Sequence, residues 1–482
     1  MRAASQRRHG HAIITVLVSL VLLATACGAR LTDEQRAAGI GAFARGGGTS
    51  TDDPLLGGAD GVTGGDNGST DGGPVDVGGS GGGTSTGGDV GTDEPAGGNG
   101  GATDVGVTGD KLTIATIADV SGVQPGLFKA AHQAMQALVA MVNSEGGIYG
   151  RQLELLLLDS KTDAGANRTA VLDACPKAFA LVGSVSAFDN GGAEAVDACG
   201  KEGIPDISAV TTTGPRILNQ DTYPAYPNRP DLFVVGSGDY MAKRFPDAVK
   251  KAGRLWLAAS TTRSNSEAKA EAYSGKSKFN FIYEAETGVV ETNYTPYVQK
   301  MEDRGVEFVT MLSDYQSIAR LTKAMRSQQY TPAVMEWDSV VYSQKFLEEA
   351  EGAAEGSWLY LNTAMFEESQ NYPEMQLYQA WLARVAPGVP PDYFGLYAWS
   401  AGRLFVELAK EVGPQATRAK LFDALKNEHS WDGFGLHASH DIGRKRASNC
   451  TMFARIKDNQ FVRAYPKSGF NCSSPLYPTS VR

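Results

Sequence analysis

Residues 111–128 read KLTIATIADVSGVQPGLF, and this stretch decides the fold class together with the helical pattern that follows it. Lys111 to Ile117 alternates as a β-strand does, and Ala118 to Gly126 reads as a loop. The apolar residues beyond the loop recur at helical spacing until Gly146-Gly147: Leu127, Ala131, Met135, Leu138, Val139 and Val142. The stretch therefore predicts a strand, a loop and a helix.

The alternation of strand and helix continues along the chain. Further strands are expected at 153–158, 179–183 and 204–210, with helices at 163–174 and 192–199. A second run of the same kind has strands at 255–259, 280–283, 306–312 and 333–335, with helices at 297–304, 317–327 and 342–350. Apolar strands joined by short helical connections predict an α/β protein in which helices cover both faces of parallel sheets.

The last third of the chain departs from this alternation. After a strand at 358–362, helices are expected at 375–385, 394–412 and 418–427, and short strands at 452–456 and 460–464. The 372 residues from Lys111 to Arg482 hold all six tryptophans. This is enough chain for two ordinary domains.

The N-terminus has the pattern of a secretory signal over residues 1–26. Arg2, Arg7 and Arg8 precede an apolar run from Ala12 to Leu23, and Ala24-Thr25-Ala26-Cys27 follows. Small residues before a cysteine are similar to a bacterial lipobox, so we expect Cys27 to carry lipid. The alternative is cleavage by ordinary signal peptidase and release of the protein.

Residues 27–110 are expected to form a flexible linker. Of the 57 glycines, 25 lie between Gly46 and Asp110, where Lys and Arg are absent. This glycine-rich segment carries the acidity: the net charge of −10 is the sum of +4 for residues 1–45, −11 for residues 46–110 and −3 for the body. A body near neutrality does not favour nucleic acid as a partner. Nothing after residue 26 has the apolar length of a membrane-spanning helix.

Four cysteines remain in the body: Cys175, Cys199, Cys450 and Cys472. An even number in an exported chain predicts disulfides. Three pairings are possible, and Cys175 with Cys199 and Cys450 with Cys472 closes the shortest loops. A metal cluster is disfavoured because no two cysteines have C-x-x-C spacing.

The segment Val142-Asn-Ser-Glu-Gly146-Gly147-Ile148-Tyr-Gly150-Arg151 resembles the type I solute-binding proteins of ABC transporters, in the branched-chain amino-acid (Leu/Ile/Val-binding) group. The resemblance covers the body and implies the periplasmic binding protein type I fold, two Rossmann-like lobes joined by a three-strand hinge. It places the first lobe at about 111–235 and 360–445, and the second at about 250–357 and 446–475.

Polar loops follow the expected strands of the first lobe, where the carboxyl ends of parallel strands face a crevice. Candidate ligand-binding residues in these loops are Ser121, Ser186, Ala187, Thr211, Thr212 and Thr213. Hydroxyls and backbone amides suit a small anion such as an amino-acid carboxylate. The alternative is that these hydroxyls only cap the helices that follow.

In the second lobe, the resemblance implies a carboxylate after the fourth strand that binds the ligand ammonium. Asp338 is the better match, and Glu336 competes with it because one residue of register decides which side chain faces the crevice. Trp337 is a candidate aromatic wall, although an aromatic residue at a strand end is more often in the core. Tyr315 is a weaker candidate.

Motifs for catalysis are poorly represented. Ser266 and Lys269 have S-x-x-K spacing without its companion motifs, so we interpret them as a coincidence on a helix surface. His437 and His440 are interpreted as a surface segment rather than a metal site. The sequence predicts no enzyme, no cofactor and no metal.

The leading hypothesis is a lipoprotein on the outer face of the bacterial cell membrane that captures an amino acid or similar small polar ligand for an ABC permease. The only expected membrane contact is the lipid. The alternative is a ligand-sensing or cell-surface interaction protein with the same fold.

Overall fold

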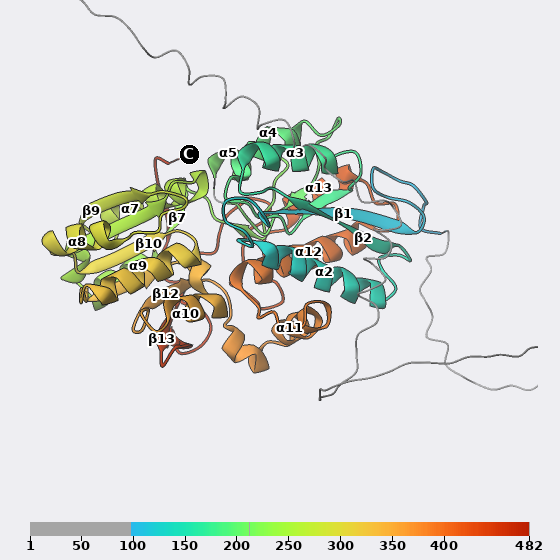
Figure 1. Ribbon diagram of the computed structural model, residues 1–482. Coiled ribbons are helices and arrows are strands. Elements are labelled where there is room, and N and C mark those ends of the chain that lie inside the picture. The colour runs from blue at the N-terminus through green and yellow to red at the C-terminus, as the bar shows by residue number, and fades with distance from the viewer. Residues whose placement is uncertain (1–97, 212, 482) are drawn as a thin grey trace, which may run out of the picture. The chain divides into compact units, whose positions relative to one another are not determined.

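The computed structural model describes residues 98–211 and 213–481, and these form two lobes (Figure 1). The predicted signal peptide, Cys27 and the linker up to residue 97 lie outside the described residues, as does Thr212.

The first lobe is built around a parallel sheet of order β2-β1-β3-β4. Its strands are β1 (Lys111–Ala118), β2 (Gln152–Asp159), β3 (Ala180–Val182) and β4 (Asp206–Ile207). Helix α2 (Lys129–Ser144) packs on one side, and α3 (Ala164–Ala174) and α4 (Ala193–Asp197) on the other (Figure 1). Every residue of β1 after Lys111 is buried, as a central strand requires.

The expected strand at 204–210 is two short strands. The ladder between β3 and β4 ends at Ile207, and β5 (Val210–Thr211) pairs with β6 (Tyr226–Pro227) in a separate two-stranded sheet. The short helices η1 (Asp189–Gly192) and α5 (Gly214–Ile217) lie in the same region.

The second lobe holds a seven-stranded sheet of order β14-β13-β12-β11-β10-β8-β9. Its parallel part consists of β8 (Ala252–Leu257), β9 (Phe281–Thr287), β10 (Phe308–Leu312), β11 (Val334–Trp337) and β12 (Trp358–Leu361). The antiparallel strands β13 (Met452–Lys457) and β14 (Gln460–Tyr465) extend one edge.

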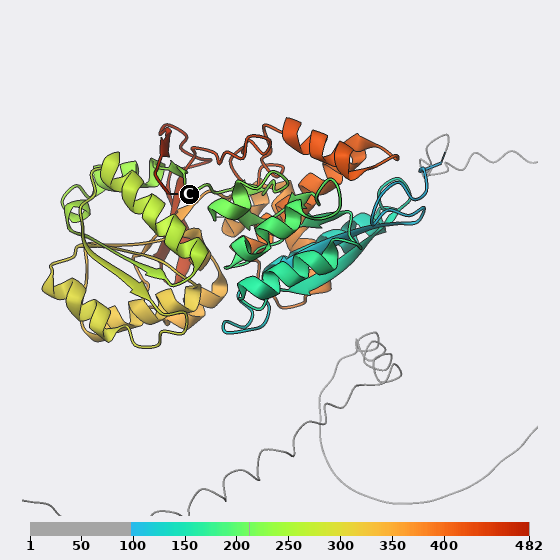
Figure 2. The same ribbon diagram turned by 90° about the horizontal axis from the view of Figure 1, so that it is seen from above.

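Helices cover both faces of this second sheet. Figure 2 shows its strands between the lime helix α7 (Ser260–Gly275) and the yellow helices α8 (Thr295–Asp303) and α9 (Tyr315–Ser327). The remaining elements of this lobe are α6 (Gly236–Arg244), η2 (Ala248–Lys251), η3 (Ser339–Val341), α10 (Gln344–Ala350), and the pair of β7 (Leu232–Val234) with β15 (Leu476–Pro478).

The chain crosses between the lobes three times. It leaves the first lobe after β6, returns after β12, and crosses again before β13. Between the last two crossings lie η4 (Phe366–Asn371), α11 (Pro373–Val385), α12 (Tyr393–Val412) and α13 (Arg418–Asn427), of which α11 and α12 pack against α2. The predicted fold class is confirmed. No helix in the described residues is long and apolar enough to cross a membrane.

The motif at residues 146–151 is explained by its backbone. Gly147 has φ +82°, and a Cβ there would lie 2.0 Å from the carbonyl oxygen of Arg151, so only glycine fits. The buried Arg151 guanidinium donates to the carbonyl oxygens of Thr108 at 2.6 Å and Pro414 at 3.0 Å. Arg151 thereby joins the segment before β1 to the segment after α12.

Two disulfides close short loops, Cys175–Cys199 and Cys450–Cys472. The prediction of disulfides is confirmed, and the pairing is the local one of the three that the sequence left open. Each bridge stabilises the fold by about 2 to 4 kcal/mol.

Two interpretations of polar residues as surface groups are wrong. His437 and His440 are 2% and 1% exposed, and their rings stack with centroids 4.8 Å apart; His437 also lies 2.8 Å from the Ser400 hydroxyl. Burial lowers the pKa of His437 to about 4, so the ring is a neutral core group. Ser266 and Lys269 are likewise buried, because this face of α7 packs against the sheet.

Lys269 forms a buried ion pair with Glu336 of β11. The ammonium lies 2.6 Å from Oε2 of Glu336 and donates to the Thr310 hydroxyl at 3.0 Å. We predict that Lys269→Met lowers the free energy of unfolding by about 3 to 5 kcal/mol, because it leaves a buried carboxylate without its cation. The double variant Lys269→Met/Glu336→Leu should lose much less, as measured by urea unfolding. An equal loss in both variants would contradict this account of the pair.

Candidate functional site

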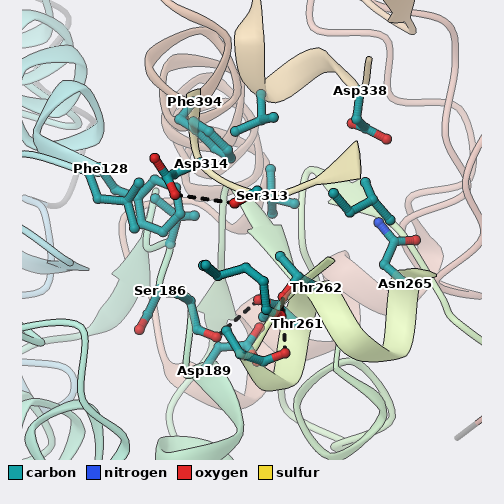
Figure 3. A pocket seen from close by; sticks show the side chains of 18 of the residues that line it. Phe128, Ser186, Asp189, Thr261, Thr262, Asn265, Ser313, Asp314, Asp338 and Phe394 are labelled. Atoms are coloured by element: carbon teal, nitrogen blue, oxygen red, sulfur yellow. Dashed lines mark hydrogen bonds between the residues drawn. The ribbon is translucent and has the colours of Figure 1, made fainter. Parts of the chain in front are cut away.

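A cavity of about 120 Å³ lies between the lobes, where strands of both sheets end (Figure 3). The first lobe contributes residues from the segments that follow β1 and β3, from β5, from β6 and the segment after it, and from the start of α12; the second contributes residues at or after the ends of β8, β10 and β11. This is the position at which open α/β sheets bind ligands. The cavity is therefore the candidate site.

Apolar and aromatic side chains form one end of the cavity. The rings of Phe128 and Phe394 meet edge to face with centroids 4.5 Å apart, and Leu127, Leu312 and Val340 also line the wall. In Figure 3, Phe128 and Phe394 lie across the pocket from Asp338 and Asn265. One end of the site thus suits the apolar body of a ligand, and the opposite end suits its polar group.

Asp338 supplies the polar end of the cavity. One of its carboxylate oxygens, Oδ1, accepts from the backbone N–H of Ser339 at 2.7 Å as the cap of η3. Burial raises the pKa of Asp338 to about 6; the nearby Lys269 opposes this shift and Glu336 adds to it. Within the described part of the chain Asp338 forms no ion pair, so it is an acidic group held against the cleft.

The loops after β2 and β3 converge on a different carboxylate, Asp119 at the end of β1. The Asp119 carboxylate is fully buried and accepts four hydrogen bonds. The donors are the hydroxyls of Ser160 at 2.5 Å and Ser186 at 3.0 Å and the backbone N–H groups of Thr162 at 3.0 Å and Ala187 at 2.7 Å. Burial raises the pKa of Asp119, and these hydrogen bonds oppose the shift. Two of the donors that the sequence suggested for a ligand anion, the Ser186 hydroxyl and the Ala187 N–H, are therefore used within the protein.

Hydrogen bonds join the two lobes across the mouth of the cleft. The Gln124 amide donates to Oδ2 of Asp314 and to the carbonyl oxygen of Val289, both at 3.0 Å. On the other side, the Thr261 hydroxyl donates to the carbonyl oxygen of Ala187 at 3.0 Å, and the Ser260 hydroxyl lies 2.8 Å from Oδ1 of Asn190. These contacts hold the lobes in one relative position.

The structure brings three of the predicted ligand-binding residues to the cavity, Ser186, Ala187 and Asp338. Glu336, the competitor of Asp338, does not line the cavity and is fully buried in the ion pair with Lys269. Thr212 lies outside the described residues.

The other predicted residues lie elsewhere, with the following contacts. Ser121 is exposed and donates to Asp159 at 2.5 Å; Thr213 donates to Asp189; Thr211 lines a smaller cavity behind the wall; Tyr315 lines a side cavity next to Val340. Trp337 is fully buried, and its indole donates to the Ser357 hydroxyl at 2.9 Å, because alternate residues of β11 face opposite sides of the sheet. The aromatic wall is thus not Trp337.

Sequence reasoning missed the aromatic residues that do line the cavity. Phe128 and Phe394 stand at the starts of helices whose remaining apolar residues are core, and Tyr226 and Tyr393 have no distinguishing neighbours in the sequence. The only feature of the sequence that could have indicated these four aromatic residues is that each follows or adjoins a loop predicted at the edge of the cleft.

Two lobes with parallel sheets, three crossings and a cleft between the lobes are the architecture of the bilobed binding proteins. The sequence profile of the periplasmic binding protein family matches residues 111–460, and the chain belongs to this family. The predicted resemblance to type I binding proteins is confirmed. Proteins of this family bind solutes outside the cytoplasm and are not enzymes. A search of curated protein sequences finds no significant match.

Several solved structures share the fold at low sequence identity. The branched-chain amino acid transporter substrate-binding protein LivJ from Streptococcus pneumoniae, in complex with isoleucine, is 14% identical with a TM-score of 0.62; the alignment covers 73% of this chain and 98% of LivJ. A fatty acid ABC transporter substrate-binding protein from Thermomonospora curvata is 17% identical with a TM-score of 0.65, covering 79% and 95%.

A third structure, a solute-binding protein of an ABC transporter from R. palustris in complex with benzoate, is 15% identical with a TM-score of 0.61, covering 77% of this chain and 98% of that protein. The three proteins have the same fold and differ in their ligands. The fold therefore does not by itself identify a ligand for this chain.

The raised pKa of Asp338 makes stability depend on pH. The native carboxyl keeps its proton up to about pH 6, whereas the unfolded one loses it near the ordinary aspartate pKa of 3.8, so the free energy of unfolding falls as pH rises between these values. We predict that Asp338→Asn removes this fall and makes the ligand-free protein more stable than the wild type by about 1 to 3 kcal/mol at pH 7.5.

At pH 3.5 the Asp338→Asn variant and the wild type should be equally stable by urea unfolding. Asp303→Asn, at an exposed position at the end of α8, is the matched control and should leave the profile unchanged. A difference between Asp338→Asn and the wild type that is the same at both pH values would contradict the prediction.

Proposed function

We propose that this protein is a solute-binding lipoprotein on the outer face of the bacterial cell membrane that captures an amino acid or similar small polar ligand for an ABC importer. The observation that carries the proposal is the cleft itself, which has an aromatic end at Phe128 and Phe394 and a carboxylate, Asp338, at the other. Membership of the binding-protein family supports transport as its use.

The lobes would close on the ligand and remove it from water. Asp338 would accept hydrogen bonds from an amino group, and this contact gains strength in a cleft of low polarity. The apolar walls would cover the remainder of the ligand, with a gain of about 25 cal/mol for each Å² of apolar surface removed from water. No bond is made or broken, and opening of the lobes releases the ligand unchanged.

Filling the cleft should abolish binding. We propose a thermal-shift panel of amino acids, amides, amines and carboxylic acids on the mature protein, where a ligand at a hundred times its dissociation constant adds about 2.7 kcal/mol of stability. Asn265→Trp, on the cleft side of α7, should eliminate the shift because the indole occupies the cavity.

Glu267→Trp, at an exposed position of the same helix, is the matched control and should keep the shift. The proposal fails if no solute of any class stabilises the wild-type protein. It also fails if Asn265→Trp responds as the wild type does.

The anchor rests on Cys27 and on the linker that follows it. A flexible chain of 65 residues, the length of the glycine-rich segment, has a root-mean-square span of about 40 to 50 Å, enough to hold the lobes above a membrane surface. We predict that Cys27→Ser moves the protein from the membrane fraction to the medium in its native host. Cys175→Ser/Cys199→Ser is the control: it removes a disulfide and should leave the protein with the membrane. Wild-type protein found in the medium would overturn the anchor.

A further inference from the structure

The charges around the cleft do not balance. Among the described residues, the cavity lining contains no Lys, Arg or His, whereas Asp314 and Asp338 both line it. Asp314 is held only by neutral donors, which are the Gln124 amide at 3.0 Å, the Ser317 hydroxyl and backbone N–H at 2.6 and 2.9 Å, and the Ser313 hydroxyl at 3.3 Å. Hydrogen bonds of this kind satisfy a carboxylate and leave its negative charge uncancelled.

Two cations in small cavities that adjoin the cleft are each matched to another carboxylate. Lys269 lies in a small cavity next to Asp338, but its ammonium is 2.6 Å from Glu336. Arg216 lies behind the wall formed by Ser186 and Val210, and its Nε is 2.9 Å from Asp206. Each of these cations lies within ion-pair distance of a carboxylate other than Asp338, and the described lining of the cavity itself carries only acidic charges.

The place where an anion would bind is already filled. The hydroxyl of Ser186 and the backbone N–H of Ala187 are the cavity-lining donors of the loop after β3, and both donate to the Asp119 carboxylate. A ligand carboxylate at this wall would have to break those bonds, and it would approach a second buried negative group. Binding of an anion at the first lobe is therefore unfavourable for two reasons: the hydrogen bonds to Asp119 would be lost, and the Asp119 carboxylate would repel the ligand.

We infer that the ligand is a small organic cation, an amine with an apolar body and no free carboxylate, with its ammonium on Asp338 and its body against Phe128 and Phe394. This inference rests on the proposed solute-binding function and narrows its ligand class. Aromatic rings favour such a cation as well, because their faces attract positive charge. Tyr226 and Tyr393 add two further rings to the lining.

The size of the cavity limits the ligand. At about 120 Å³ the space is of the order of the roughly 150 Å³ cavity that accepts one benzene molecule. Compact amines of that size class are suitable probes. Polyamines and peptides exceed it.

The test uses two sets of matched probes in which only the charged groups differ. The aliphatic set is 3-methylbutylamine, leucine and 4-methylpentanoate; the aromatic set is 2-phenylethylamine, phenylalanine and 3-phenylpropanoate. Isothermal titration on the mature protein at pH 7.5 measures each dissociation constant. We expect an amine to bind at least tenfold more tightly than the amino acid of its set, and the carboxylates to show no binding.

Asp338→Asn should weaken the amine at least tenfold, and the control Asp303→Asn should leave its affinity unchanged. The inference is overturned if an amino acid or carboxylate binds as tightly as its amine, if no amine of either set binds, or if Asp338→Asn binds the amine as the wild type does. In each of these cases the proposed function survives if another solute of the panel binds and Asn265→Trp abolishes that binding. The proposed function itself fails only when no solute of any class binds.

Discussion

The buried carboxylate of Asp119 is the interaction on which the first lobe's wall of the cleft depends. Parallel strands end at the same edge of a sheet, so the segments after β2 and β3 bring their polar groups together next to the end of β1. A single side chain, that of Asp119 directly after β1, accepts hydrogen bonds from Ser160, Thr162, Ser186 and Ala187. Without it, four buried donors would lose their acceptor, each at a cost of about 1 to 3 kcal/mol.

The second lobe also holds acidic side chains at the end of a strand, but with a different arrangement of partners. Glu336, inside β11, meets Lys269 beneath α7, while Asp338, just past the strand's end, lines the cleft. Two acidic residues two positions apart thus have separate roles, one neutralised by a cation and one held against the cavity. The ion pair fixes the strand end from which Asp338 projects.

The carboxylates of Asp119 and Asp338 determine which ligand groups the cleft can bind. The fold is shared with proteins solved with isoleucine and with benzoate at 14% and 15% identity, so the scaffold places few limits on ligand charge. In this chain the hydrogen-bond donors in the first lobe's wall are occupied by the buried Asp119 carboxylate. The second lobe presents a further carboxylate, Asp338, in a cavity that aromatic rings also line. Ligand preference follows from which polar groups the protein leaves without an internal partner.

The sequence by itself determined the order of strands and helices and the division into two similar runs, because periodicity and glycine positions report local backbone and burial. The even number of cysteines predicted the disulfides, and the motif at residues 142–151 indicated the family. The sequence also identified Asp338, Ser186 and Ala187 as residues at the strand ends of the cleft. Only the tertiary structure decided that Ser186 and Ala187 donate to Asp119, that Trp337 belongs to the core and that Phe128 and Phe394 meet. The reason is physical: a pattern records which face of an element is apolar, whereas the partner of a polar group depends on segments far apart in the chain that fold side by side.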